Sequence, residues 1–187
     1  MDESLSPLLT PLSPEASNLL IEAGTRRTWP RGAYLLREGT TCRHLHGVKR
    51  GALRVFQLND GKDINLRFYF EHSFATDLKS LRSGQPSEYH IQAMEPTVTL
   101  TLEGAALRAL YDRSPEIERW GRSLLESLLI REQDHANFFK LYSPEDRYAW
   151  LLEHEPQIPA RVSLTRLASY MGITRESLSR IRARARK

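Results

Sequence analysis

The residue types best suited to binding chemistry gather at the C-terminal end of the chain. Residues 161–187 contain eight lysines or arginines and one acidic residue, Glu176, and so carry a net charge of +7. The whole chain carries +4, which leaves −3 for residues 1–160. Lysine and arginine bind the phosphates of nucleic acids, and a basic end on a mildly acidic protein is typical of nucleic-acid binding. The alternative is a basic helix that contacts only solvent.

The spacing of apolar residues in this basic end predicts two short helices. Ser163 is a typical helix cap, and apolar residues recur at i, i+3, i+4 and i+7 from Leu164. Gly172 tolerates the left-handed backbone that ends a helix, and Thr174 caps the second helix. Two helices joined by a tight turn form a helix-turn-helix. Its expected core consists of Leu167, Ala168, Gly172, Leu178 and Ile181.

The second predicted helix separates apolar from polar residues. At roughly 100° per residue, Leu178, Ile181 and Ala185 share one side, whereas arginines and a glutamate lie opposite. An arginine matches O6 and N7 of guanine, a glutamate accepts from the amino group of cytosine, and hydroxyls near the helix start suit phosphates. We therefore expect DNA contacts from six residues, which are Thr174, Arg175, Glu176, Ser177, Ser179 and Arg180.

Other reactive residue types give no comparable pattern. Cys42, His44 and His46 alternate in "CRHLH" and would share one face of a strand, where sulfur and imidazole can bind Zn²⁺ or Cu⁺. Such alternation also arises by chance and no fourth ligand is evident, so we predict neither a metal site nor a cofactor. The histidines and serines show no nucleophile–base spacing, which argues against an enzyme.

The rest of the chain must fold into elements that position this basic end. Between Trp29 and Leu102, short β-type segments alternate with turn formers, and "TVTLTL" alternates strictly, which predicts a β-sandwich, barrel or β-roll. No apolar run approaches the ~20 residues of a membrane helix, and the acidic N-terminus lacks a signal pattern. The lone Cys42 excludes an internal disulfide framework. We therefore expect a cytoplasmic protein without a membrane partner.

A long helix is predicted after the β-rich region. Ser114, Pro115 and Glu116 are strong helix-start signals, and the helix that follows would run for about 25 residues. Its apolar stripe needs a cover, which a second copy of the helix would provide, although packing within one chain is the alternative. The expected dimer interface consists of Ile117, Trp120, Leu124 and Leu128.

The order of β-rich domain, long helix and helix-turn-helix resembles the Crp/Fnr superfamily of bacterial transcription regulators. "RGAYLLREGT" and "GVKRGALRVFQLNDGKDINLRFYF" are similar to the family's cyclic-nucleotide-binding β-roll, and "TRESLSRI" resembles its recognition helix. The resemblance implies an α+β fold with a sensor β-roll at 1–113, a dimerisation helix at 114–142 and a helix-turn-helix domain at 143–187. It also implies a homodimer that binds DNA and contacts RNA polymerase.

One stretch departs from the family's effector-binding members, whose phosphate cassette has a Gly-Glu pair and then Arg-Ser or Arg-Thr. Thr76 and Asp77 stand at the first pair, and Ser87 and Glu88 at the second. An arginine binds phosphate bidentately, whereas a carboxylate repels it; Arg82 is a substitute cation. The expected effector pocket therefore consists of Asp77, Arg82, Ser87 and Glu88, and we predict that cyclic AMP does not bind.

These patterns together predict a sequence-specific transcription regulator that binds a palindromic operator as a homodimer. An unidentified small-molecule effector would act by changing the pairing of the long helices. The alternative is a non-enzymatic ligand-sensing or protein-interaction module whose basic end binds nucleic acid only non-specifically.

Overall fold

The computed structural model describes residues 9–10 and 12–185, which form two compact units. The roll unit consists of the described residues up to Val55 together with Phe68–Leu125, and the helical unit consists of Phe56–Arg67 and the residues from Glu126 onward. Two elements contribute residues to both units, namely the long helix α5 (Pro115–Leu141) and the hairpin of β4 (Leu53–Asn59) and β5 (Lys62–Tyr69). The α+β fold class predicted from the sequence is confirmed.

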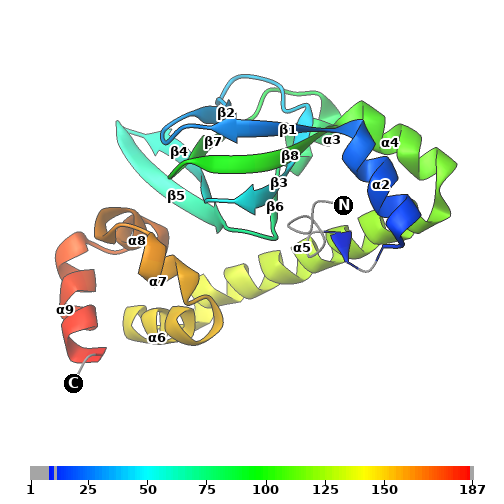
Figure 1. Ribbon diagram of the computed structural model, residues 1–187. Helices are drawn as coiled ribbons and strands as arrows, with labels where there is room; N and C mark the ends of the chain where they lie inside the picture. The colour runs from blue at the N-terminus through cyan, green and yellow to red at the C-terminus, as the bar shows by residue number, and fades with distance from the viewer. Residues whose placement is uncertain (1–8, 11, 186–187) are drawn as a thin grey trace. The chain divides into compact units, whose positions relative to one another are not determined.

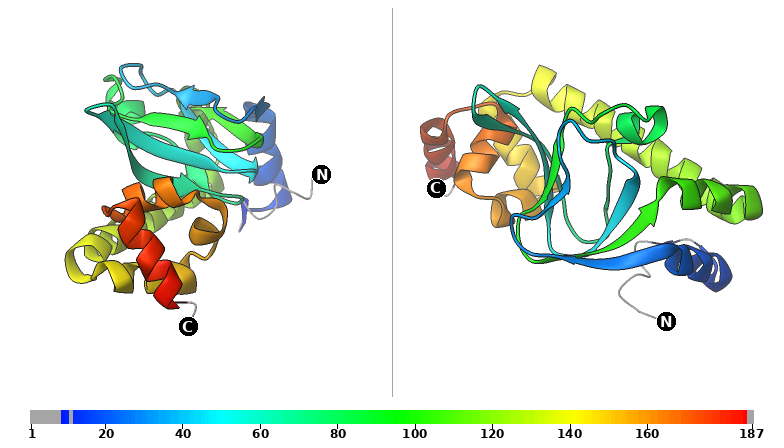
Figure 2. Two further views of the ribbon diagram at one scale, coloured as in Figure 1. Left: turned by 90° about the vertical axis from the view of Figure 1, so that its left-hand side faces the viewer. Right: turned by 90° about the horizontal axis from the view of Figure 1, so that it is seen from above.

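Two four-stranded sheets build the β-roll. Besides β4 and β5, the strands are β1 (Gly24–Trp29), β2 (Tyr34–Leu36), β3 (His44–Arg50), β6 (Phe74–Ala75), β7 (His90–Ala93) and β8 (Thr97–Glu103). One sheet has the order β1-β8-β3-β6 and the other β2-β7-β4-β5. In the right-hand view of Figure 2 the strands curve around a shared interior. The roll therefore has an inner face and an outer face, and β-strand alternation assigns successive side chains to one or the other.

The main hydrophobic core of the roll unit lies between β8, β3 and three helices. These helices are α2 (Pro14–Ala23), α4 (Gly104–Arg113) and the start of α5 (Figure 1). Leu100 and Leu102, alternate residues of β8, pack there with Leu20 of α2. Ser13, which caps α2, donates from its hydroxyl to the Glu116 carboxylate in the first turn of α5 at 2.8 Å. This bond joins the beginnings of two helices that are distant in sequence.

The helical unit packs four short helices with the C-terminal part of α5. They are α6 (Pro144–His154), α7 (Gln157–Arg161), α8 (Leu164–Met171) and α9 (Arg175–Ala185). Arg147 of α6 donates to the carbonyl oxygens of Phe138, Phe139 and Met171, at 3.3, 2.8 and 3.0 Å. Because the last carbonyl groups of a helix have no partner within it, this one guanidinium satisfies the ends of both α5 and α8.

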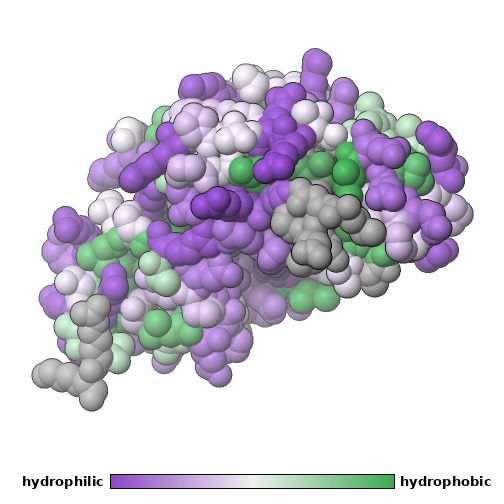
Figure 3. Space-filling model, in the orientation of Figure 1, coloured by the Kyte–Doolittle hydropathy of each residue, from purple (hydrophilic) through white to green (hydrophobic). Residues whose placement is uncertain are grey.

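The surface is mostly hydrophilic, and hydrophobic residues are visible as patches over the C-terminal helices in Figure 3. Within the described ranges, none of the helices combines the length and the hydrophobicity that a membrane span requires. The most exposed apolar side chains include Leu129 at 70%, Ile130 at 61% and Leu141 at 72%, all on α5. These side chains leave apolar surface of α5 in contact with water, and binding of a partner there would bury it.

Candidate nucleic-acid interface

Local hydrogen bonds define both helices of the predicted helix-turn-helix. The Ser163 hydroxyl accepts from the N–H of Arg166 at the start of α8, and Gly172 ends α8 with a φ of 69°. At the start of α9, the Thr174 hydroxyl accepts from the N–H of Ser177 at 3.2 Å. Each helix therefore begins at a residue whose side chain replaces a missing backbone partner, as the sequence pattern predicted.

The inward face of α9 is buried against the rest of the helical unit. Leu178 is fully buried and Ile181 is 6% exposed, and the five residues expected to form the core are buried except for the turn residue Gly172. Ala185, expected on the same face, is exposed because it lies in the last turn, one turn beyond Ile181. The buried contacts fix the rotation of α9 about its own axis, and so determine which side chains point outward.

The outward face of α9 carries the predicted base-reading residues. Arg175, Glu176, Ser179 and Arg180 are exposed, whereas Ser177 is half-buried and bonded to the cap. Arg180 donates to the Ser177 hydroxyl at 3.3 Å, and within the described part of the chain Arg175 has no hydrogen bond or ion pair. These guanidinium groups keep most of their donors for a ligand, and a phosphate or a guanine edge fits that geometry.

The C-terminal half of α9 extends this polar surface. Arg182 and Ser179 line a hollow of about 320 Å³ together with Leu164 of α8 and Ala183. Arg184 forms an exposed ion pair with Glu145 of α6 at 3.4 Å, which leaves it less available to a phosphate. With four arginines and one glutamate, α9 has a net charge of +3. The helix is therefore both shaped and charged to enter a groove of nucleic acid.

The four residues of the expected dimer interface lie in two different settings. Ile117 is fully buried and Trp120 is 6% exposed, and both belong to the core of the roll unit, where Trp120 packs edge-on against Phe74. These two side chains are covered by their own chain and have no surface for a second copy. Leu124 and Leu128 are half-buried. The exposed large apolar residues of α5 are Leu125, Leu129, Ile130 and Leu141.

The residues expected to form an effector pocket are bonded mainly to the protein itself. Asp77 caps the helix α3 (Leu78–Ser83) by accepting from the N–H of Ser80 at 3.1 Å. The Ser87 hydroxyl donates to the carbonyl of Tyr89 at 3.0 Å. Glu88 pairs with Lys79, and this hydrogen bond raises the pKa of the lysine. Arg82 lies in the last turn of α3. Asp77, Ser87 and Glu88 thus stabilise the α3 region locally.

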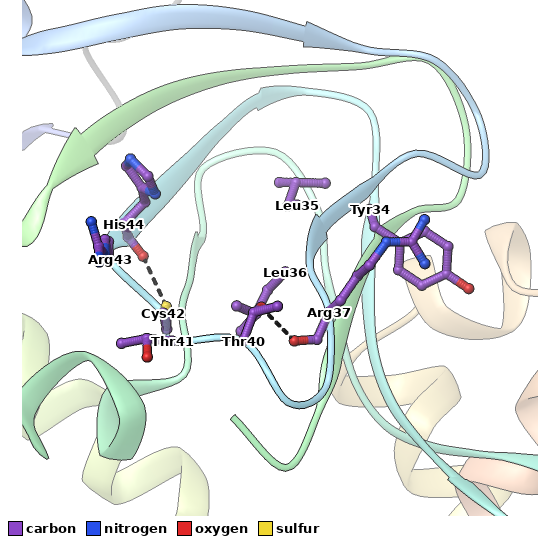
Figure 4. A pocket seen from close by; sticks show the side chains of 9 residues that line it. All are labelled: Tyr34, Leu35, Leu36, Arg37, Thr40, Thr41, Cys42, Arg43 and His44. Atoms are coloured by element: carbon purple, nitrogen blue, oxygen red, sulfur yellow. Dashed lines mark hydrogen bonds between the residues drawn. The ribbon is translucent and has the colours of Figure 1, made fainter. Parts of the chain in front are cut away.

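A different part of the roll contains an open cavity of about 320 Å³ (Figure 4). Its lining runs from Tyr34 of β2 through the following loop to His44 of β3 and includes Arg37 and Arg43. The Arg37 guanidinium stacks 3.8 Å from the centre of the Tyr34 ring. The cavity lining contains two cations and no carboxylate, an arrangement that favours an anionic ligand. Cys42 and His44 of "CRHLH" belong to this lining, but their pattern predicted no cavity.

The histidines of "CRHLH" are part of the roll's interior. His46 is 2% exposed and its Nδ1 lies 3.0 Å from the Thr101 hydroxyl, which contacts the Thr99 hydroxyl at 2.9 Å. Burial, with the nearby His44 and Arg27, lowers the pKa of His46 to about 3. The described residues contain no group of three or more side chains positioned to hold a metal ion. His46 is therefore a neutral member of a hydrogen-bonded chain.

Comparison with known proteins finds relatives for the roll and for nearly the whole chain. The sequence pattern of the cyclic nucleotide-binding domain family matches residues 26–114, the segment that contains nearly all of both sheets. The transcriptional activator protein Anr of Pseudomonas protegens is 24% identical over 199 residues, covering 96% of this chain and 79% of Anr. Residues 26–114 thus resemble a cyclic nucleotide-binding domain, and nearly the whole chain resembles a transcriptional activator.

Solved structures share the fold of this chain. FixK2 from Bradyrhizobium japonicum has a TM-score of 0.72 at 18% identity, covering 86% of this chain and 83% of FixK2. The c-di-GMP-responsive global regulator CLP of Xanthomonas campestris has a TM-score of 0.73 at 17% identity, covering 93% of this chain and 92% of CLP. At these identities the likeness establishes the fold and leaves the ligand of this chain open.

Proposed function

We propose that this chain is a sequence-specific DNA-binding transcription regulator of the Crp/Fnr type. The observation that carries the proposal is α9, whose Leu178 and Ile181 are buried while Glu176 and Arg180 face solvent. A helix held on one side that presents arginine and glutamate on the other suits the major groove of DNA. The relative Anr is a transcriptional activator, which supports the same function. Such a regulator acts in the cytoplasm and requires no catalysis.

We further propose that the regulator is a homodimer on a palindromic operator. Leu125, Leu129 and Ile130 are 46%, 70% and 61% exposed on one segment of α5, and a second copy of α5 would remove them from water. A two-fold pair would present two copies of α9 to major grooves about 34 Å apart. RNA polymerase and an unidentified effector in the roll are the further partners that the proposal includes.

The proposal is tested by selecting duplexes from a random pool with the purified chain. We expect a palindromic consensus whose half-sites lie about 10 base pairs apart, centre to centre. Affinity for the consensus should exceed affinity for scrambled duplex by about 10³-fold or more. The alternative function predicts binding that falls steeply with salt but enriches no sequence, because phosphate contacts carry no sequence information. Failure to enrich any sequence would contradict the proposed function.

A further inference from the structure

The hairpin end, residues 56–67, belongs to the helical unit although it continues strands β4 and β5 of the roll. Its turn is Asp60-Gly61, with φ values of 49° and 74°. Two successive residues with positive φ make a tight two-residue turn that matches the twist of the flanking strands and fixes their register. The hairpin end is therefore a defined structural element, and alternate residues of β5 point to the same side.

On that side, β5 is hydrogen bonded to α8, the first helix of the helix-turn-helix. The Ser169 hydroxyl donates to the carbonyl oxygen of Asp63 at 2.7 Å. It accepts from the backbone N–H of Asn65 at 3.0 Å and from the Asn65 side-chain amide at 3.3 Å. One hydroxyl thus uses its donor and both acceptor positions on two residues of one strand. Asn65 is 3% exposed and Ser169 is half-buried, so the contacts between them are partly shielded from water and their loss has a cost.

The next residue on the same side of β5, Arg67, holds α5. It pairs through two guanidinium nitrogens with Glu132 and donates to Nε2 of His135 at 2.7 Å. The His135 ring in turn lies 5.5 Å from the ring of Tyr170, the neighbour of Ser169 on α8. Strand β5, helix α5 and helix α8 therefore meet in one connected set of contacts.

This set of contacts leaves the reading face of α9 free. Arg175, Glu176 and Arg180 stay exposed while Ser169 is bonded to β5. The buried residues of α8, among them Leu167 and Met171, face the core that also holds Leu178 of α9. A contact that orients α8 therefore orients α9 as well, without covering it.

We infer that Ser169 and Asn65 are positioning residues for DNA reading, through which the hairpin end orients the helix-turn-helix. The inference rests on the proposed function. Without the Ser169 hydroxyl, α8 and α9 would sample more orientations relative to the hairpin end. Only some of these orientations would fit the operator, so the affinity for the operator would fall. Non-specific binding, which depends on charge alone, would be unaffected.

The test measures dissociation constants for the selected operator and for a scrambled duplex by fluorescence anisotropy. Ser169→Ala and Asn65→Ala should each weaken operator binding by about threefold to tenfold, the range expected for losing a partly buried hydrogen bond, and leave scrambled-duplex binding unchanged. Because Ser169→Ala already removes the hydrogen bond that Asn65→Ala breaks, the double variant should be no weaker than Ser169→Ala alone. Ser169→Thr, which keeps the hydroxyl, should bind like the parent. The matched control is Asn59→Ala, an exposed asparagine of the same hairpin.

Several outcomes would overturn the inference. Operator binding by Ser169→Ala that equals the parent's would remove the positioning role, and tighter binding would mean that the hairpin end opposes DNA binding. Additive losses in the double variant would mean that the two residues act separately. A parent protein that prefers no duplex would overturn the proposed function and this inference with it, whereas a selective parent with an unaffected Ser169→Ala variant overturns this inference alone.

Discussion

At the scale of the residue, Glu176 and Arg180 lie about one turn apart on the outward face of α9, with Arg175 at the start of the helix. A base contact carries specificity, whereas a phosphate contact carries only affinity. We expect Arg180→Ala to cost roughly 1–3 kcal/mol on the consensus and to relax the choice of base at one position of each half-site. Glu176→Ala should relax a different position. Binding-site selection on each variant makes the measurement.

The matched control is Arg122→Ala, which removes the same charge from an exposed position of α5, where Arg122 pairs with Glu118. Binding-site selection with this variant should give the same consensus as the parent, with the same base preference at every position. If Arg180→Ala also returned the parent's consensus unchanged, α9 would be an electrostatic anchor and another element would read the sequence.

A second prediction at this scale concerns the buried histidine of the roll. The pKa of His46 is lowered from 6.5 to about 3, so between these pH values the unfolded chain binds a proton that the native chain excludes. Stability therefore falls as the pH decreases from 6.5 toward 3. At pH 4.5 this histidine should cost about 2–3 kcal/mol relative to pH 7. Urea unfolding at both pH values measures the difference.

His46→Gln should show a smaller loss of stability between pH 7 and pH 4.5 than the parent. The control is His154→Gln, at a histidine whose side chain is 49% exposed, which should behave like the parent. His135, whose pKa is lowered to about 4 by burial and by Arg67, contributes in the same direction in all three proteins. An unchanged pH dependence in His46→Gln would contradict the prediction.

At the scale of the element, α5 is covered by its own chain at one end and exposed further along. Replacing Leu129 and Ile130 together with Glu changes side chains that are 70% and 61% exposed, so the protomer should fold normally. Buried in a dimer seam, the carboxylates would lack partners, and that cost should make the protein monomeric. Light scattering at micromolar concentration checks the mass. Arg119→Glu, at an exposed polar position of the same helix, should stay dimeric.

The same helix explains which elements the sequence predicts and which it does not. Caps and turns depend on neighbours in the chain, so Ser163, Gly172 and Thr174 could be identified from local patterns. A helical stripe, in contrast, shows only that some surface covers it. The stripe predicts Ile117 and Trp120 at a partner helix, but both lie in the core of the roll unit, where Phe74, distant in sequence, packs against Trp120. The helical spacing of apolar residues alone cannot distinguish packing within the chain from packing against a second copy.

The contact between β5 and α8 illustrates the same limit of local patterns. Asn65 and Ser169 are 104 positions apart, and neither residue stands out by type or spacing. The sequence predicts both elements, but only the folded chain brings this strand and this helix together. Asp77 and Glu88 are a further example. The sequence shows that they differ from the residues of the resembled family, but it does not show that Asp77 caps α3 and that Glu88 pairs with Lys79.

At the scale of the whole molecule, the roll and the helix-turn-helix differ in the charged side chains that they offer to a ligand. The helix α9 presents arginines to solvent, whereas in the roll the carboxylate of Glu88, which the sequence predicts to line an effector pocket, is paired with Lys79. A ligand that bound there would have to displace this pair or accept a carboxylate beside its own negative charge. The proposed effector pocket therefore offers an anionic ligand a less favourable site than the arginine-rich face of α9 does.

The last prediction follows from that difference. We expect no measurable heat when cyclic AMP is titrated into the protein, and no change in operator affinity when cyclic AMP is present. The reason is that Ser87, whose hydroxyl is used on Tyr89, stands where an arginine would hold the phosphate. Cyclic GMP, which carries the same phosphate, should behave alike, and operator DNA titrated under the same conditions serves as the positive control. A dissociation constant in the low micromolar range corresponds to about 8 kcal/mol of binding free energy and would show that other side chains replace the cassette arginine.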